Sequence, residues 1–411
     1  MRFRGLAILA CGLAAARAQP AAGVAGPLPP DIRTRNLFAG LLGRSEAEVD
    51  AKVSAAWRQF SGGDPGSQRL FYPVAGDMAY IPDVANNDVR TEGLSYGMMI
   101  CVQLNRQAEF NQLWRWAKAN LYHPSGPFRG FFAWHGDLEG RQLDPGPASD
   151  GEEWFVMALF FASHRWGSGD GIFNYERQAQ DLLRTMLHKS EERGHEDYTD
   201  MFNRAAREVV FVPHGEGALF SDPSYHLPAF YELWARWAES PADRDFMVAA
   251  ATTSRALFRK AADPVTGLMP DYCEFDGRPH ARRGHEDFRF DAWRTLSNPA
   301  VDYCWFGADP EAAQEANRVL RFLSGDDHMA HDRFKLDGTP VGDDPNSPGL
   351  VSMAATAGLA ADPDLARPFV ERLWNMEMPS GHFRYYNGML YMLALLEAGG
   401  RFRVYAPQAS H

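Results

Sequence analysis

Apolar residues recur at three- and four-residue spacing along most of the chain, which is the periodicity of an α-helix with one buried face. This pattern predicts twelve helices, over residues 46–60, 93–106, 108–120, 150–166, 173–188, 226–238, 241–262, 296–306, 308–324, 348–360, 364–376 and 387–398. Turn-forming runs such as PSG, GSGDG and DPNSPG separate the stretches. Strand-like alternation is confined to two short segments, 68–80 and 207–213. The sequence therefore predicts an all-α fold.

The predicted helices are of two kinds. Residues 173–188 and 310–324 carry a polar face, whereas residues 94–104 and 389–397 are apolar nearly all round. A helix that is apolar on every side is buried on every side. Buried helices that alternate with amphipathic ones indicate an inner ring inside an outer ring, so we expect an (α/α)6 barrel of six inner and six outer helices. An α-solenoid would show a similar periodicity, but the chain has no fixed-period repeat.

The first residues have the three parts of a secretory signal peptide. Residues 1–18 combine a basic start, a short apolar run and an A-x-A site. We expect residues 19–35 to be a flexible segment and residues 36–405 to form a single catalytic domain, because no low-complexity linker interrupts them. The predicted location is secreted or periplasmic.

Charge and cysteine content narrow the possible partners. The chain has 41 Lys+Arg against 53 Asp+Glu, a formal net charge of −12, which argues against nucleic acid as a partner. No apolar run is long enough to span a bilayer, so no membrane association is expected after removal of the signal. Cys101, Cys273 and Cys304 lack the spacing of a metal site; a Cys273–Cys304 disulfide stays open. The sequence predicts no cofactor and no metal, and it leaves the oligomeric state unknown.

Three carboxylate clusters lie where loops enter predicted helices. Glu92 precedes an interior helix and so points into a central cleft, although a carboxylate there can also cap the helix. Asp291 and Arg294 are three residues apart and share one face of a helical turn, as a structural ion pair would also do. Asp150 begins a run with two further glutamates, where helix capping or a bound cation is the alternative.

Aromatic residues occur at the same loop-to-helix junctions. Trp134, Tyr225, Tyr385 and Tyr386 each lie at such a junction, where they are core residues or, if gathered at one end of an inner ring, a platform for planar or sugar ligands. No P-loop or HExxH motif is present. Carboxylates and aromatic rings in one cleft suit glycoside hydrolysis.

Five stretches in the same order resemble glycoside hydrolase family 8. They are RTEGLSYGMMI, SDGEEWFVMALFFA, PSYHLPAFYELW, FRFDAWRT and FRYYNGMLYMLALL, and they extend over most of residues 68–403. Within the family, the sequence is most similar to reducing-end xylose-releasing exo-oligoxylanases and related xylanases. The resemblance implies an (α/α)6 barrel and an inverting hydrolase that acts on oligosaccharides.

The resemblance also assigns roles to residues of this chain. It implies that Glu92 is the general acid and Asp291 the general base, and that Asp150 holds the sugar at the cleavage subsite. Arg294 would steady the base, and Trp134, Tyr225 and Tyr385 or Tyr386 would contact sugars.

Two features of the substrate stay open: the position of the cleaved bond along the oligosaccharide, and the kind of sugar. The expected substrate is a β-1,4-xylo-oligosaccharide cut at its reducing end, with an endo-acting xylanase or β-1,4-glucanase as the alternative. An exo enzyme needs a loop that closes the cleft, and the candidate region 325–349 offers His328 and His331 without placing the closing residue. A sugar-binding barrel without catalysis, or an epimerase with histidine pairs, fits the carboxylate clusters less well.

Overall fold

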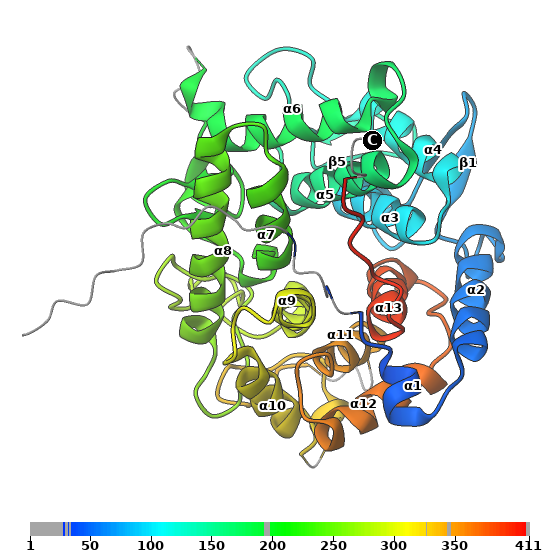
Figure 1. Ribbon diagram of the computed structural model, residues 1–411, viewed down its shortest axis with the longest axis vertical. Helices are drawn as coiled ribbons and strands as arrows, with labels where there is room; N and C mark the ends of the chain where they lie inside the picture. Colours follow the sequence, from blue (N-terminus) through cyan, green and yellow to red (C-terminus); the bar gives the residue numbers. More distant parts are fainter. Residues whose placement is uncertain are drawn as a thin grey trace, which may run out of the picture.

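The computed structural model describes residues 28, 32, 34–192, 198–325, 327–342 and 347–407 (Figure 1). The expected signal peptide at residues 1–18 and most of the expected flexible segment at 19–35 lie outside these residues. No helix in the described ranges combines the length and the apolar character that a bilayer crossing requires.

All twelve predicted helices are present, with ends shifted by up to four residues. The thirteen α-helices of the described residues are α1 (Leu37–Leu42), α2 (Glu46–Gly62), α3 (Thr91–Gln103), α4 (Gln107–Asn120), α5 (Ser149–Trp166), α6 (Tyr175–His188), α7 (Pro228–Trp237), α8 (Pro241–Ala261), α9 (Asn298–Phe306), α10 (Ala312–Leu323), α11 (Pro348–Ala357), α12 (Pro363–Asn375) and α13 (Arg384–Ala398). Helix α1 was not predicted, because six residues are too few to show a helical period.

The helices form two concentric rings, which confirms the predicted (α/α)6 barrel. Helices α3, α5, α7, α9, α11 and α13 surround the centre, and α2, α4, α6, α8, α10 and α12 lie outside them (Figure 1). Burial follows the same division. In α3 every residue except Glu92 is buried, whereas α10 buries one face, formed by Ala312, Ala316, Val319, Leu320 and Leu323.

Short antiparallel strands line one end of the barrel. The hairpin of β1 (Tyr72–Val74) and β2 (Met78–Tyr80) lies in the predicted segment 68–80, and β8 (Glu208–Val209), which pairs with β7 (Phe202–Asn203), lies in 207–213. A four-stranded sheet was not predicted, because its strands have two or three residues each. Its order is β3 (Pro82–Asp83), β4 (Asp88–Arg90), β5 (His135–Gly136) and β6 (Gln142–Asp144).

The three cysteines of the described residues are buried thiols. The structure therefore does not form the Cys273–Cys304 disulfide that the sequence left open. Burial raises the pKa of the Cys101 and Cys273 thiols well above the usual value, which keeps both protonated and unreactive. The stability of the barrel accordingly comes from its apolar core.

Candidate active site

A cleft of about 630 Å³ opens at one end of the barrel. Seven of the eight predicted site residues line it: Glu92, Trp134, Asp150, Tyr225, Asp291, Tyr385 and Tyr386. Glu92, Asp150 and Tyr385 lie in the first turns of α3, α5 and α13, and Tyr225 and Asp291 precede α7 and α9 in short 3-10 helices. The beginnings of five inner helices therefore meet at this cleft.

The start of α3 is fixed by the short sheet and by a tyrosine ring. Strand β4 pairs with β5, and the Thr91 amide donates to the Trp134 carbonyl at 2.9 Å, so Trp134 lies beside the start of the helix. A Cβ atom at Gly93 would lie 2.6 Å from the Tyr385 ring. Glycine is therefore required after Glu92 if α13 is to place Tyr385 against α3.

Arg294 is the eighth predicted site residue, and it lies buried behind the cleft wall. It forms ion pairs with Asp291 at 3.2 Å and with Asp150 at 3.5 Å, and it donates to the Tyr96 hydroxyl. The guanidinium also lies 5.5 Å from the centre of the Tyr225 ring. One buried cation thus links the predicted carboxylates of α5 and of the segment before α9, where it balances part of their charge.

The environment of Glu92 favours its protonated form. Oε1 of Glu92 is buried and accepts no hydrogen bond from the residues that the structure describes. Burial raises the pKa of Glu92 to about 8, against the attraction of Arg294 and with the help of the charges on Asp291 and Asp150. A carboxyl group in this state is neutral at pH 7 and can donate a proton.

The side chains of Asp291 and Asp150 differ in their exposure to solvent. The Asp291 side chain retains 34% of its accessible surface, whereas that of Asp150 retains 7%. Burial raises the pKa of Asp150, and the nearby Arg294 opposes this shift. Of these two cleft-lining aspartates, Asp291 is thus the one that stays open to water.

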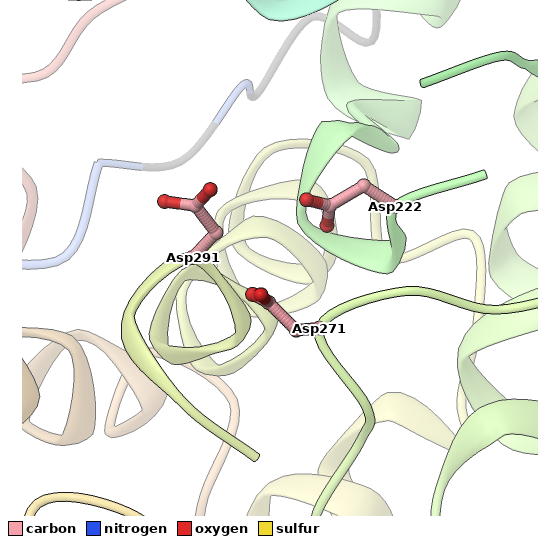
Figure 2. A group of neighbouring side chains, drawn as sticks. All are labelled: Asp222, Asp271 and Asp291. Atoms are coloured by element: carbon pink, nitrogen blue, oxygen red, sulfur yellow. The ribbon is translucent and has the colours of Figure 1, made fainter. Parts of the chain in front are cut away.

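The carboxylates of the Asp150 cluster do not converge. Glu152 accepts the Phe132 amide at 3.0 Å, and Glu153 accepts the Tyr231 hydroxyl at 2.6 Å. Both glutamates thus contact separate parts of the barrel, and among the described residues the carboxylates of this cluster do not gather as the ligands of one cation would. The acidic groups that do come together in the described part of the chain are Asp222, Asp271 and Asp291 (Figure 2).

Several lining residues were not predicted. The wall also contains Asp83, Arg90, Asp144, Phe211, His214, Tyr272 and Phe290. Arg90 is the first residue of the RTEGLSYGMMI stretch and forms a 3.1 Å ion pair with Asp83, so that stretch was a signal for it. Phe290 belongs to the FRFDAWRT stretch and begins the 3-10 helix Phe290–Leu296. The others lie in loops and short strands, where no periodic pattern marks them.

The candidate region for closing the cleft lies partly outside the described residues, which omit 326 and 343–346. His328 stacks on Phe322 with ring centres 4.2 Å apart, and His331 is paired with the Gly342 carbonyl at 2.9 Å. Neither histidine lines the described cleft.

Comparison with known proteins agrees with this arrangement. The sequence profile of Glycosyl hydrolases family 8 matches residues 78–400, which include all eight predicted site residues. The chain belongs to glycosyl hydrolase family 8.

Among individual relatives, the reducing-end xylose-releasing exo-oligoxylanase Rex8A of Paenibacillus barcinonensis is 43% identical over 90% of this chain and 97% of its own length. A solved structure of Rex8A complexed with xylose has a TM-score of 0.86 at 41% identity, covering 91% of this chain and 98% of that one. A family 8 xylanase of Teredinibacter turnerae, solved as a catalytic mutant with xylohexaose, has a TM-score of 0.87 at 43% identity, with 91% and 98% covered.

Proposed function

We propose that this glycosyl hydrolase releases xylose from the reducing end of β-1,4-xylo-oligosaccharides with inversion at the anomeric carbon. The observation that carries the proposal is that two different carboxyl groups line a single cleft: that of the half-buried Glu92, with Oε1 withdrawn from water, and the water-accessible one of Asp291. The similarity to exo-oligoxylanases supports xylo-oligosaccharides as the substrate class. The signal-like residues 1–18 support export as the setting in which the enzyme meets them.

In the proposed mechanism the two carboxyl groups act from opposite sides of the sugar. Glu92 donates its proton to the leaving glycosidic oxygen. Asp291 takes a proton from a water molecule that attacks the anomeric carbon from the other face. An inverting enzyme separates these groups by roughly 6.5–9.5 Å so that the water fits between sugar and base.

Asp150 and Arg294 support the two reacting groups. Arg294 forms an ion pair with Asp291 at 3.2 Å, which holds the carboxyl group of the proposed base in place. Asp150 is buried beside Arg294 and lines the cleft, where its carboxyl group can accept a hydrogen bond from a sugar hydroxyl. Its charge also raises the pKa of Glu92.

The second candidate function is an endo-acting xylanase. It is favoured by the equally high similarity to the xylanase that was solved with xylohexaose, a substrate long enough to fill several subsites. The two functions differ in whether a loop blocks the cleft beyond the reducing-end sugar.

Xylotetraose distinguishes them. The exo function predicts xylose and xylotriose as the first products, whereas the endo function predicts xylobiose as a major first product. NMR of the early reaction should show the newly formed reducing end as the α-anomer, because inversion of a β-linkage gives that configuration. Cellotetraose serves as the control for glucan activity. A β-anomer at the newly formed reducing end would contradict the mechanism.

The aromatic wall yields a further prediction. The half-buried Trp134 lines the cleft and is covered on one side by Arg90, whose guanidinium lies 5.6 Å from the ring centre. Trp134→Ala removes a face on which a sugar can stack in both ground and transition state, so KM should rise roughly tenfold with a smaller change in kcat. Steady-state kinetics on xylotriose measure both constants. An unchanged KM would place the sugars elsewhere.

A further inference from the structure

Three aspartates from different segments place their carboxyl groups together beside the cleft. Asp222 caps the 3-10 helix Pro223–Tyr225, Asp271 lies in the loop after α8, and Asp291 lies in the 3-10 helix Phe290–Leu296. One carboxylate oxygen from each lies within 4.8 Å of the others. Figure 2 shows the carboxyl groups of Asp222 and Asp271 reaching towards the segment that carries Asp291.

The backbone holds the three segments in this arrangement. Ser221 and Cys273 exchange two backbone hydrogen bonds, of 2.9 and 2.8 Å, which set Asp222 next to the Asp271 loop. Oδ1 of Asp271 accepts the Ala292 amide at 3.2 Å, directly after Asp291. Because the Asp222 segment is tied to the Asp271 loop, and that loop to the Asp291 segment, the carboxyl groups cannot separate without disturbing the wall of the cleft.

The three aspartates are not equally supplied with hydrogen-bond donors. Asp291 forms an ion pair with Arg294, and Asp271 forms hydrogen bonds with the Ala292 amide and the His285 ring. Asp222 is completely buried and has the Ser224 amide on Oδ1, at 2.7 Å, while its Oδ2 receives no hydrogen bond from any described residue. A buried carboxylate oxygen without a donor is costly, and three adjacent negative charges are costlier still.

We propose that Asp222 is held as a neutral carboxylic acid whose O–H donates to the carboxylate of Asp291, directly or through one water, and so positions the general base. The inference rests on the proposed function, since it takes Asp291 as the base. Asp222 is a positioning residue in this scheme. Its hydrogen bond occupies one side of the Asp291 carboxylate and leaves the other to receive the proton of the attacking water.

The charged surroundings agree with a neutral Asp222. The charged groups that face the cluster come from several elements. Asp271 and His285 belong to the loop, Arg289, Asp291 and Arg294 to the segment before α9, and Glu92 and Asp150 to α3 and α5. Three neutral titratable groups also face it, the hydroxyls of Tyr225 and Tyr272 and the thiol of Cys273. Burial raises the pKa of Asp222 well above its usual value, and the charges of Asp271 and Asp291 raise it further against the single opposing charge of Arg294. Protonation of Asp222 relieves this repulsion and makes Oδ2 a donor.

The test compares Asp222→Asn with Asp222→Ser in the full-length enzyme. Asparagine has the shape of a neutral carboxylic acid, and it can accept from Ser224 and donate through its amide. Serine can still cap the 3-10 helix but is too short to reach Asp291. Asp276→Asn, an exposed aspartate in the same part of the chain, is the matched control. Thermal unfolding of each variant checks that the barrel is folded.

The readouts are kcat, KM and the low-pH limb of kcat/KM, which reports ionisation of the base in the free enzyme. Asp222→Asn is expected to keep kcat within about threefold of wild type, and the low-pH limb of its kcat/KM profile should lie at the same pH as in wild type. Asp222→Ser is expected to lower kcat at least ~10-fold, because a hydrogen bond to a charged group is lost. It should leave KM little changed and move the low-pH limb to higher pH, because the ionised base has lost a donor.

Four results would overturn the inference. If Asp222 is ionised, Asp222→Asn removes a negative charge within 4.8 Å of the cluster and moves the limb to lower pH by about one unit or more. Wild-type kinetics in Asp222→Ser, or a loss of more than ~10-fold in Asp222→Asn, would deny the positioning role. Inactivation of the wild-type enzyme by EDTA with recovery on adding Ca²⁺ would show that the aspartates hold a cation. A fully active Asp291→Asn variant would instead remove the proposed function itself.

Discussion

Replacing Glu92 by glutamine is expected to lower kcat on xylo-oligosaccharides at least ~10²-fold, the usual contribution of a general acid. The amide has nearly the same size as the protonated carboxyl group but has no proton to give to the leaving oxygen. Binding should change little, because Glu92 is neutral at pH 7 when its pKa is about 8. The measurement is steady-state hydrolysis of xylotriose, with Glu139→Gln, an exposed glutamate, as the control.

The pH profile and the leaving group make this prediction specific. A group whose pKa is raised to about 8 is protonated below that pH, so wild-type kcat/KM should fall as the pH rises through about 8. Glu92→Gln should lack this limb. It should also regain much of its rate on a xylo-oligosaccharide with a dinitrophenol leaving group, which departs without protonation. A variant that is equally slow on both substrates would not have lost its acid.

The helices were predictable because each contains enough turns to show its period. Helix α3 was recognised as interior since it is apolar on every side, and in the structure Glu92 is its one residue that is not fully buried. The same pattern located Glu92, Asp150 and Tyr385 at helix beginnings. That these beginnings meet at one cleft followed from the ring arrangement, which places all inner helices in parallel.

The remainder of the cleft depends on pairings that leave no period in the sequence. Strands β3 to β6 have two or three residues each, and they decide where Asp83, Arg90 and Asp144 lie. Asp222 and Asp271 are 49 positions apart and come together through one backbone bridge between Ser221 and Cys273. Tertiary contacts of this kind override local propensity, so the sequence did not reveal the aspartate cluster.

Arg294 illustrates how far a local pattern reaches. The three-residue spacing predicted its pairing with Asp291, which the structure contains at 3.2 Å. The spacing did not predict that Arg294 also contacts the Tyr96 hydroxyl and Asp150, which belong to α3 and α5. The ion pair is therefore part of a buried network that joins three inner helices or their leading segments.

Replacing Asp291 by asparagine is expected to lower kcat at least ~10²-fold, since the attacking water loses its proton acceptor. The substitution keeps the size of the side chain but removes its charge beside Arg294. That guanidinium is buried, retaining 4% of its surface, and keeps Asp150 as a partner at 3.5 Å, so the fold should survive. Xylotriose hydrolysis measures the loss, and thermal unfolding checks the barrel.

A substrate with an activated leaving group distinguishes the roles of the two carboxyl groups. The dinitrophenyl substrate should not rescue Asp291→Asn, because departure of the leaving group was never the missing step, whereas it should rescue Glu92→Gln. The Asp276→Asn control, which also replaces a charged aspartate by its amide, should behave as wild type. Rescue of both variants would mean that Asp291 does not activate water, and rescue of neither would mean that Glu92 does not protonate the leaving oxygen. The opposite responses of two carboxyl groups in one cleft follow from their environments. The carboxyl group of Glu92 is withdrawn from water and neutral, whereas that of Asp291 is partly open to water and paired with a cation.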